Sequence, residues 1–169
     1  HSFWRKIWGD FRQLNIEWLL QYFVIEAYDE YQLSHPKEEI LDKGGHIFLA
    51  KDKEQIIGTV ALMKETDISF ELTKMSVTRD NQGKGVSKLL MDACVNLAKE
   101  KKWDRLFLYS NTILVPAIQL YRRYGFREIP LETQSHYSRT NIKMELKLTW
   151  KYYGCRNKNS WIQWSLPAG

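Results

Sequence analysis

A glycine-rich segment in the middle of the chain has the composition of an anion-binding turn. Residues 82–87 read QGKGVS and lie between a strand-like run at 69–77 and a helix-like run at 84–101. Glycines let the backbone approach a ligand closely, and unpaired N–H groups at the start of a helix point toward it. The segment predicts a phosphate site, to which Arg79 and Lys88 would add positive charge. The alternatives are an ordinary glycine turn and solvated basic side chains.

Two familiar phosphate loops do not fit this spacing. A P-loop requires a glycine five residues before its Gly-Lys pair, and that position is Thr78. A dinucleotide-binding fingerprint requires a third glycine where this chain has Lys88. We therefore expect a different phosphate compound as the ligand.

A second segment follows the next apolar, strand-like run. It begins with Asn111 and continues into a helix predicted over 115–123, because Pro116 suits the first turn of a helix and Gly125 suits its end. It contains the pattern Ala-x-x-Leu-Tyr-x-x-x-Gly-Phe at residues 117–126. The asparagine could contact a ligand or cap the following turn.

Together the two segments resemble the GCN5-related N-acetyltransferase (GNAT) family, whose first pattern is Gln/Arg-x-x-Gly-x-Gly/Ala. The resemblance covers roughly residues 10–148, with Ser87 where the family has Gly or Ala. It implies an α/β (α+β) fold with a central mixed, mostly antiparallel twisted sheet, splayed between two parallel strands and flanked by helices. It also implies acetyl-CoA as co-substrate. The residues it assigns to this cofactor are Met75, Val77, Gln82, Gly83, Lys84, Gly85, Val86, Ser87, Lys88, Asn111 and Tyr121.

Acetyl transfer to an amine needs a base for the ammonium proton, a donor for the developing oxyanion and an acid for the leaving thiolate. The candidates are Glu71, directly or through water, the Met75 N–H group and Tyr121. The resemblance places Met75 against the thioester carbonyl and Val77 along the pantetheine arm. The alternatives are a Glu71 that faces solvent or pairs with a lysine, and a Tyr121 that only packs.

The strand expected at 69–77 contains a break in its alternation. Phe70 and Leu72 place apolar residues on even positions, whereas Met75 and Val77 place them on odd positions. One explanation is a one-residue β-bulge, which returns the later apolar residues to the same face of the sheet. The alternative is a strand buried on both faces, in which no alternation is expected. The GNAT resemblance implies a bulge here, beside the splay.

The remaining elements are predicted from periodicity and turn residues. In the last strand we expect apolar side chains inward and Lys143, Glu145 and Lys147 outward. Aromatic residues could line an acceptor pocket or simply pack; they are Trp18, Tyr22, Tyr28, Tyr31 and Tyr137. The predicted elements are a strand remnant at 1–8, a helix at 10–22 capped by Asp10, a helix at 36–43, a hairpin turning at 51–54, and strands at 105–109 and 141–148.

The composition is that of an ordinary globular domain. The chain has 169 residues, of which 44% are hydrophobic and 27% charged, which is enough for a core. No apolar run reaches the ~18 residues that span a bilayer. The histidines are scattered without metal-site spacing, and Cys94 lies on an apolar helix stripe as a core residue. We expect a cytoplasmic protein, monomeric or homodimeric, without a metal or a membrane partner.

The net charge of +5 is uneven, because residues 150–169 carry three basic residues and no acidic one. We divide the chain into a GNAT domain at 1–149 and a basic, Trp-rich tail at 150–169 whose role is unknown. The domain is not basic enough for a nucleic-acid binder. The tail could stack on bases, dock on the domain or a second subunit, or be foreign to the natural protein.

The predicted function is that of an acetyl-CoA-dependent N-acetyltransferase, in which a primary amine attacks the thioester directly within a ternary complex. The acceptor, a small molecule or a protein amine, is left open. The alternatives are a non-catalytic acyl-CoA sensor with the same fold and nucleic-acid binding through the tail.

Overall fold

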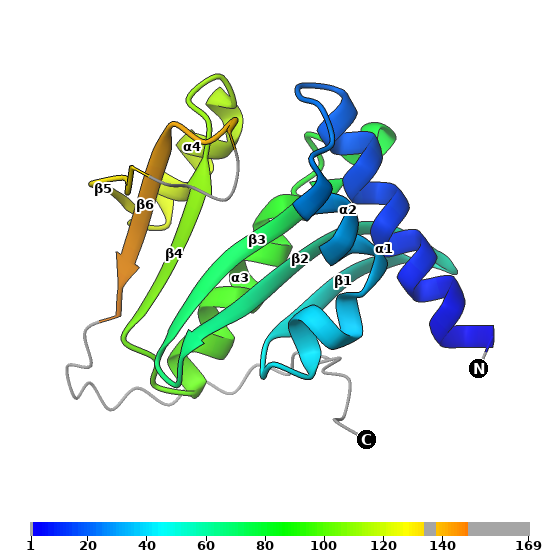
Figure 1. Ribbon diagram of the computed structural model, residues 1–169, viewed down its shortest axis with the longest axis horizontal. Coiled ribbons are helices and arrows are strands. Elements are labelled where there is room, and N and C mark those ends of the chain that lie inside the picture. The colour runs from blue at the N-terminus through cyan, green and yellow to red at the C-terminus, as the bar shows by residue number, and fades with distance from the viewer. Residues whose placement is uncertain (1, 134–137, 149–169) are drawn as a thin grey trace.

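A six-stranded sheet forms the centre of the protein (Figure 1). The structure is a computed structural model that describes residues 2–133 and 138–148. The strand order is β1-β2-β3-β4-β6-β5, and every neighbouring pair is antiparallel except the parallel pair β3–β4. The strands are β1 (His46–Asp52), β2 (Gln55–Thr66), β3 (Ser69–Val77), β4 (Arg105–Ser110), β5 (Arg127–Ile129) and β6 (Ile142–Lys147). This is the mixed, mostly antiparallel sheet that the sequence predicts.

Helices cover both faces of the sheet. Figure 1 shows α1 and α2 in front of the strands and α3 behind them. In the contacts between elements, α1 lies against β2 and β3, and α3 against β1, β2 and β3. The helices are α1 (Ser2–Leu20), α2 (Ala27–Ser34), the π-helix η1 (Lys37–Leu41), the 3₁₀-helix η2 (Arg79–Asn81), α3 (Val86–Glu100) and α4 (Val115–Arg123).

Each face of the sheet has its own hydrophobic cluster. The cluster under α3 and α4 contains Met91 and Leu106, and the cluster under α1 and α2 contains Phe11 and Ala61, all fully buried. Central strands are therefore buried on both faces, as expected for a sheet covered by helices on each side. Cys94 is fully buried in the first cluster, which confirms the core position predicted for it.

The predicted β-bulge is present in β3. Lys74 and Met75 together oppose the single residue Val60 of β2. Lys74 has φ = 55°, in the left-handed region that residues with a Cβ seldom adopt. β3 pairs with β4 only from Ser69 to Glu71, so the two parallel strands separate before the bulge is reached. Figure 1 shows the resulting splay between the two strands.

The prediction for the N-terminus is wrong. Residues 2–8 belong to α1 rather than to a strand, and Asp10 lies inside this helix instead of capping it. Trp4 and Trp8, one helical turn apart, stack with their ring centroids 5.9 Å apart. Such i,i+4 contacts favour a helix, and they explain why α1 extends further toward the N-terminus than predicted.

Two short elements, α2 and β5, do not appear among the predictions. The residues that α2 buries are Asp29, Gln32 and Leu33, so this helix has no apolar stripe that periodicity could reveal.

The helix predicted at 36–43 is the π-helical turn η1, after which Gly44 takes φ = 85°.

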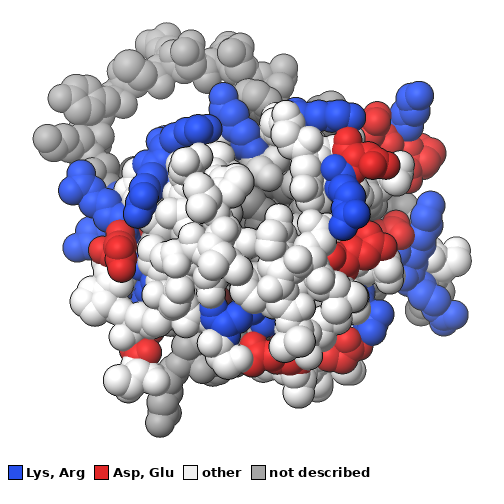
Figure 2. All heavy atoms as spheres, turned by 90° about the horizontal axis from the view of Figure 1, so that it is seen from above, with Lys and Arg blue, Asp and Glu red and all other residues white. Residues whose placement is uncertain are grey.

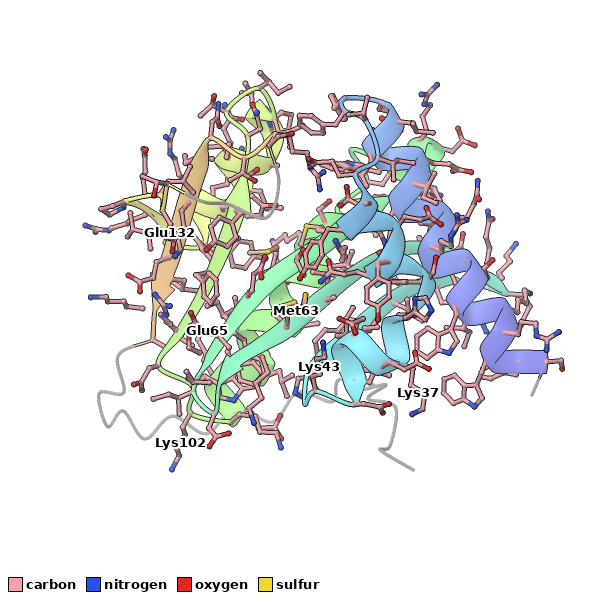
Figure 3. All side chains as sticks on the ribbon, in the orientation of Figure 1. Lys37, Lys43, Met63, Glu65, Lys102 and Glu132 are labelled. Carbon is pink, nitrogen blue, oxygen red and sulfur yellow. The ribbon has the colours of Figure 1, made fainter. Side chains whose placement is uncertain are left out.

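The outward orientation predicted for Lys143 is also wrong. Lys147 is exposed as expected, but Lys143 is buried. Its ammonium nitrogen lies 5.2 Å from the ring centroid of Phe107 and 5.1 Å from that of Tyr109, and it pairs with Glu132. Figure 3 shows Glu132 beside β6, where it can neutralise this buried charge.

Candidate active site

A groove of about 790 Å³ runs beside β3 from the glycine turn to α4. Gly83 and Gly85 in this turn have φ values of 73° and 82°, which glycine adopts without steric cost. Gly85 is the N-cap of α3 and has no side chain that could cap the first helical turn. N–H groups at such a terminus suit an anion, as the sequence predicts.

Most of the residues predicted for the cofactor line this groove. Lys84 and Asn111 do not, and Arg79 lines a separate cavity beside α1. Contact of any of them with a cofactor stays a prediction. The predicted residues that line the groove are Met75, Val77, Gln82, Gly83, Gly85, Val86, Ser87, Lys88 and Tyr121.

A second, smaller cavity of about 90 Å³ lies beside the groove, against α1 and α2. Its lining includes Glu71, Lys74 and Arg139. The residues that line both this cavity and the groove are Trp18, Met75, Leu114 and Tyr121. The bulge of β3 and the predicted acid Tyr121 therefore lie where two separate openings meet.

The aromatic residues predicted for an acceptor pocket have different positions. Trp18 lines both cavities and Tyr22 lines the groove. Tyr28 and Tyr31 line neither; Tyr28 accepts a hydrogen bond from Gln32, and Tyr31 is exposed. Tyr137 lies outside the described residues. For Tyr28 and Tyr31 a place in an acceptor pocket stays a prediction, beside the alternative that they only pack.

Glu71 lies at the last paired position of β3 before the splay and lines the smaller cavity. Burial raises the pKa of this carboxyl from 4.5 to about 7, although the positive charges of Lys74 and Lys143 oppose the change. A carboxylate whose pKa lies near 7 can accept a proton at neutral pH and release it again, as a general base must.

Tyr121 is buried in α4 and lines both cavities. Its ring lies 6.0 Å from that of Phe126. No hydrogen bond of its hydroxyl group is found within the described part of the chain. Burial raises the pKa of this phenol to about 12, so the group keeps its proton at neutral pH and can donate it.

The side chain of Asn111 stabilises the loop before α4 through hydrogen bonds. Its Nδ2 donates to the Arg139 carbonyl at 2.6 Å, and its Oδ1 accepts from the Ile113 N–H at 3.0 Å. This is the turn-capping arrangement that the sequence leaves open as an alternative. A contact with the cofactor stays a prediction for this residue.

Sequence reasoning missed a buried cluster of charges in the smaller cavity. The carboxylate of Asp29 accepts two hydrogen bonds from Arg139, each 2.7 Å long, and lies 3.7 Å from the ammonium group of Lys74. Burial raises the pKa of Asp29, but the bonds from Arg139 and the Glu26 N–H lower it overall. Asp29 and Arg139 are 110 positions apart, so no local pattern could connect them.

Other kinds of site receive no support. Within residues 2–133 and 138–148, no cluster of His, Cys, Asp and Glu side chains has the arrangement of a metal site. None of the helices described is both long and apolar enough to cross a membrane. Figure 2 shows the face at the top of Figure 1, where uncharged side chains fill the middle and charges of both signs lie around them.

The sequence between residues 43 and 128 matches the family model described as "Acetyltransferase (GNAT) domain". This match covers half of the chain. The chain belongs to the GNAT acetyltransferase family. The family and the fold that the sequence predicts are thereby confirmed.

Curated relatives match part of the chain, and two of them illustrate the similarity. N-acetyltransferase 8B of Rattus norvegicus is 26% identical over 97 residues, which are 54% of this chain and 44% of the relative. N-acetylaspartate synthetase of Danio rerio is 30% identical over 87 residues, which are 51% of this chain and 31% of the relative. The chain thus spans less than half the length of the curated relatives it matches.

Solved structures share the fold over most of the chain. A GNAT-family acetyltransferase from Staphylococcus aureus Mu50 has a TM-score of 0.77 at 22% identity, covering 86% of this chain and 95% of its own. The PaiA N-acetyltransferase of Thermoplasma acidophilum, solved in complex with coenzyme A, has a TM-score of 0.66 at 17% identity, covering 85% and 94%.

Proposed function

We propose that this protein is an acetyl-CoA-dependent N-acetyltransferase in which a primary amine attacks the thioester directly. The observation that carries the proposal is the meeting of two cavities at Met75 and Tyr121. A ternary complex needs separate entries for a long cofactor and for an acceptor, and it needs one place where both can react.

The larger groove suits the cofactor. Its glycine turn and the start of α3 would bind the pyrophosphate, and the segment from Met75 to Val77 would pair with the pantetheine arm. The splay leaves this part of β3 without pairing from β4. Coenzyme A in the PaiA structure and acetyl-CoA in the GNAT acetyltransferase of Elizabethkingia anophelis support this choice of ligand.

The reaction follows from three groups around the meeting point. Glu71, directly or through a water molecule, takes a proton from the ammonium form of the acceptor, whose nitrogen then attacks the carbonyl carbon. The Met75 N–H donates to the oxyanion that forms. As the C–S bond breaks, Tyr121 donates its proton to the sulfur, and the acetylated nitrogen loses its second proton, which restores the Tyr121 phenol directly or through water. Glu71 releases its proton to solvent, so the products are the N-acetylated amine, coenzyme A and one proton.

A thiol-release screen tests this function. Acetyl-CoA is incubated with the protein and a panel of amines that includes amino acids, polyamines, aminoglycosides and lysine peptides, and free coenzyme A is measured. We expect release that depends on both the protein and one class of amine. Binding of acetyl-CoA without release for any amine would instead indicate a non-catalytic acyl-CoA sensor.

A further inference from the structure

The peptide unit that joins Lys74 to Met75 is fixed at its carbonyl end. The hydroxyl of Thr59, a fully buried residue of β2, donates to the Lys74 carbonyl oxygen at 3.0 Å. A trans peptide unit is planar, so its C=O and N–H bonds point in opposite directions. No cis peptide bond occurs in the described chain. By holding the Lys74 oxygen, Thr59 therefore directs the Met75 N–H away from itself.

The Thr59 hydroxyl is itself oriented by α1. Asn15, which is 2% exposed, donates from Nδ2 to Thr59 Oγ1 at 3.2 Å and to the Phe11 carbonyl at 2.9 Å. The Ser76 hydroxyl lies 3.2 Å from Thr59 Oγ1, and either oxygen can be the donor in this contact. When Thr59 Oγ1 accepts from both Asn15 and Ser76, its single proton is left for the Lys74 oxygen. Asn15 and Thr59 are both buried, so water does not compete for these bonds.

The side chain of Lys74 provides a second attachment. Its left-handed backbone conformation costs energy for any residue with a Cβ and must be maintained by the surroundings. The ammonium group lies 3.7 Å from the Asp29 carboxylate, which Arg139 holds with two hydrogen bonds. The bulge is thus held through the carbonyl of Lys74 from β2 and through its side chain from α2.

We propose that Thr59 is a positioning residue for acetyl transfer, which aims the Met75 N–H at the thioester oxygen by holding the Lys74 carbonyl. The proposal rests on the proposed function, because it assigns Met75 as the oxyanion donor. Thr59 touches neither reactant in this scheme and acts only through the peptide unit. Met75 lines both cavities, so a rotation of this unit would take its N–H away from the point where they meet.

The test uses Thr59→Val, which removes the hydroxyl and keeps the shape, and Thr59→Ser, which restores a hydroxyl. Thr66→Val is the control, because Thr66 lies at the other end of β2 and its hydroxyl oxygen accepts a hydrogen bond from the nearby Ile68 N–H. The amide proton shift of Met75 is measured by NMR in complexes with acetyl-CoA and with coenzyme A. The difference between them reports the hydrogen bond to the acetyl carbonyl.

We expect a downfield difference in the wild-type protein, Thr59→Ser and Thr66→Val, and its loss in Thr59→Val. For the amine found by the thiol-release screen, kcat should fall about 10-fold in Thr59→Val, less than the 10²–10³-fold loss typical when an oxyanion donor is removed. The Kd for acetyl-CoA should stay within about twofold. A Thr59→Val variant with the wild-type shift difference and kcat would overturn the proposal.

Failure of the proposed function would look different. If acetyl-CoA shifts no groove amide in the wild-type protein, the cofactor assignment falls and the positioning role falls with it. If the wild-type protein shows the amide shifts and releases coenzyme A, the proposed function stands, and the Thr59 variants then test the positioning role alone. Should Thr59→Val not fold, Thr59→Cys takes its place, since a thiol is a weaker donor of similar size and should reduce the shift difference.

Discussion

Replacing Glu71 by Gln removes the predicted base while keeping its size. Burial holds the pKa of Glu71 at about 7, and only the ionised form can accept the ammonium proton. We therefore expect kcat/KM of the wild-type protein to rise with pH through about 7. In Glu71→Gln this limb should disappear, and kcat/KM at pH 8 should fall by about 10²-fold. A primary alkyl amine is the suitable acceptor, because its own pKa of about 10 keeps its titration separate.

The same pKa predicts a change in stability. The interval from 4.5 to about 7, at ~1.36 kcal/mol per pH unit, corresponds to about 3 kcal/mol of unfolding free energy. Because the folded pKa is raised, this contribution is present below pH 4.5 and is lost as the pH rises through about 7. Above pH 8, Glu71→Gln should therefore be more stable than the wild-type protein by up to about 3 kcal/mol, with little difference at pH 4.5. Urea unfolding at the two pH values measures this.

Glu65→Gln is the matched control. Glu65 lies in β2 (Figure 3) and accepts hydrogen bonds from Ser69 and Arg105. Burial raises the pKa of Glu65, but these hydrogen bonds lower it overall. Glu65→Gln should therefore reduce the stability of the protein above pH 5. It should leave the pH profile of kcat/KM unchanged. The reasoning about Glu71 would be refuted if Glu71→Gln kept the rising limb and was no more stable than the wild-type protein at pH 8.

Three further changes test the cofactor site and the domain boundary. Tyr121→Phe should lower kcat and kcat/KM together by about 10²-fold with an unchanged Kd for acetyl-CoA; an unaltered kcat would make this tyrosine structural. Gly85→Val should weaken acetyl-CoA binding in calorimetry by at least about 10-fold, whereas Gly9→Val should not. No atom lies within 4 Å of a Cβ added at either position, so a loss at Gly85 would come from the ligand and the strained φ of 82°. A chain ending at residue 149 should still bind acetyl-CoA, and a folded but non-binding truncation would show that the tail belongs to the site.

Local patterns in the sequence predicted the parts of the site that local chemistry determines. The glycines of the turn, the Pro116 and Gly125 boundaries of α4, and the phase slip in β3 each arise within a few residues. The bulge could be located because the apolar residues of this strand switch from even to odd positions. The extra residue that keeps them on one face of the sheet must lie at that switch.

Contacts between distant segments could not be predicted in this way. The cluster of Asp29, Lys74 and Arg139 joins three segments, and its residues look like ordinary surface charges in the sequence. Lys143 occupies an outward position by alternation, but Phe107 and Tyr109 of the neighbouring strand cover it. Tertiary packing, rather than propensity, decides these positions.

Initial-rate kinetics with acetyl-CoA and the accepted amine test the central claim most directly. If acetyl-CoA occupies the groove while the amine enters through the smaller cavity, both must be bound before any product leaves. Double-reciprocal plots at several fixed amine concentrations should then intersect, with coenzyme A released only when the amine is present. Parallel lines with release of coenzyme A before the amine is added, which indicate an acetylated enzyme, would contradict direct attack.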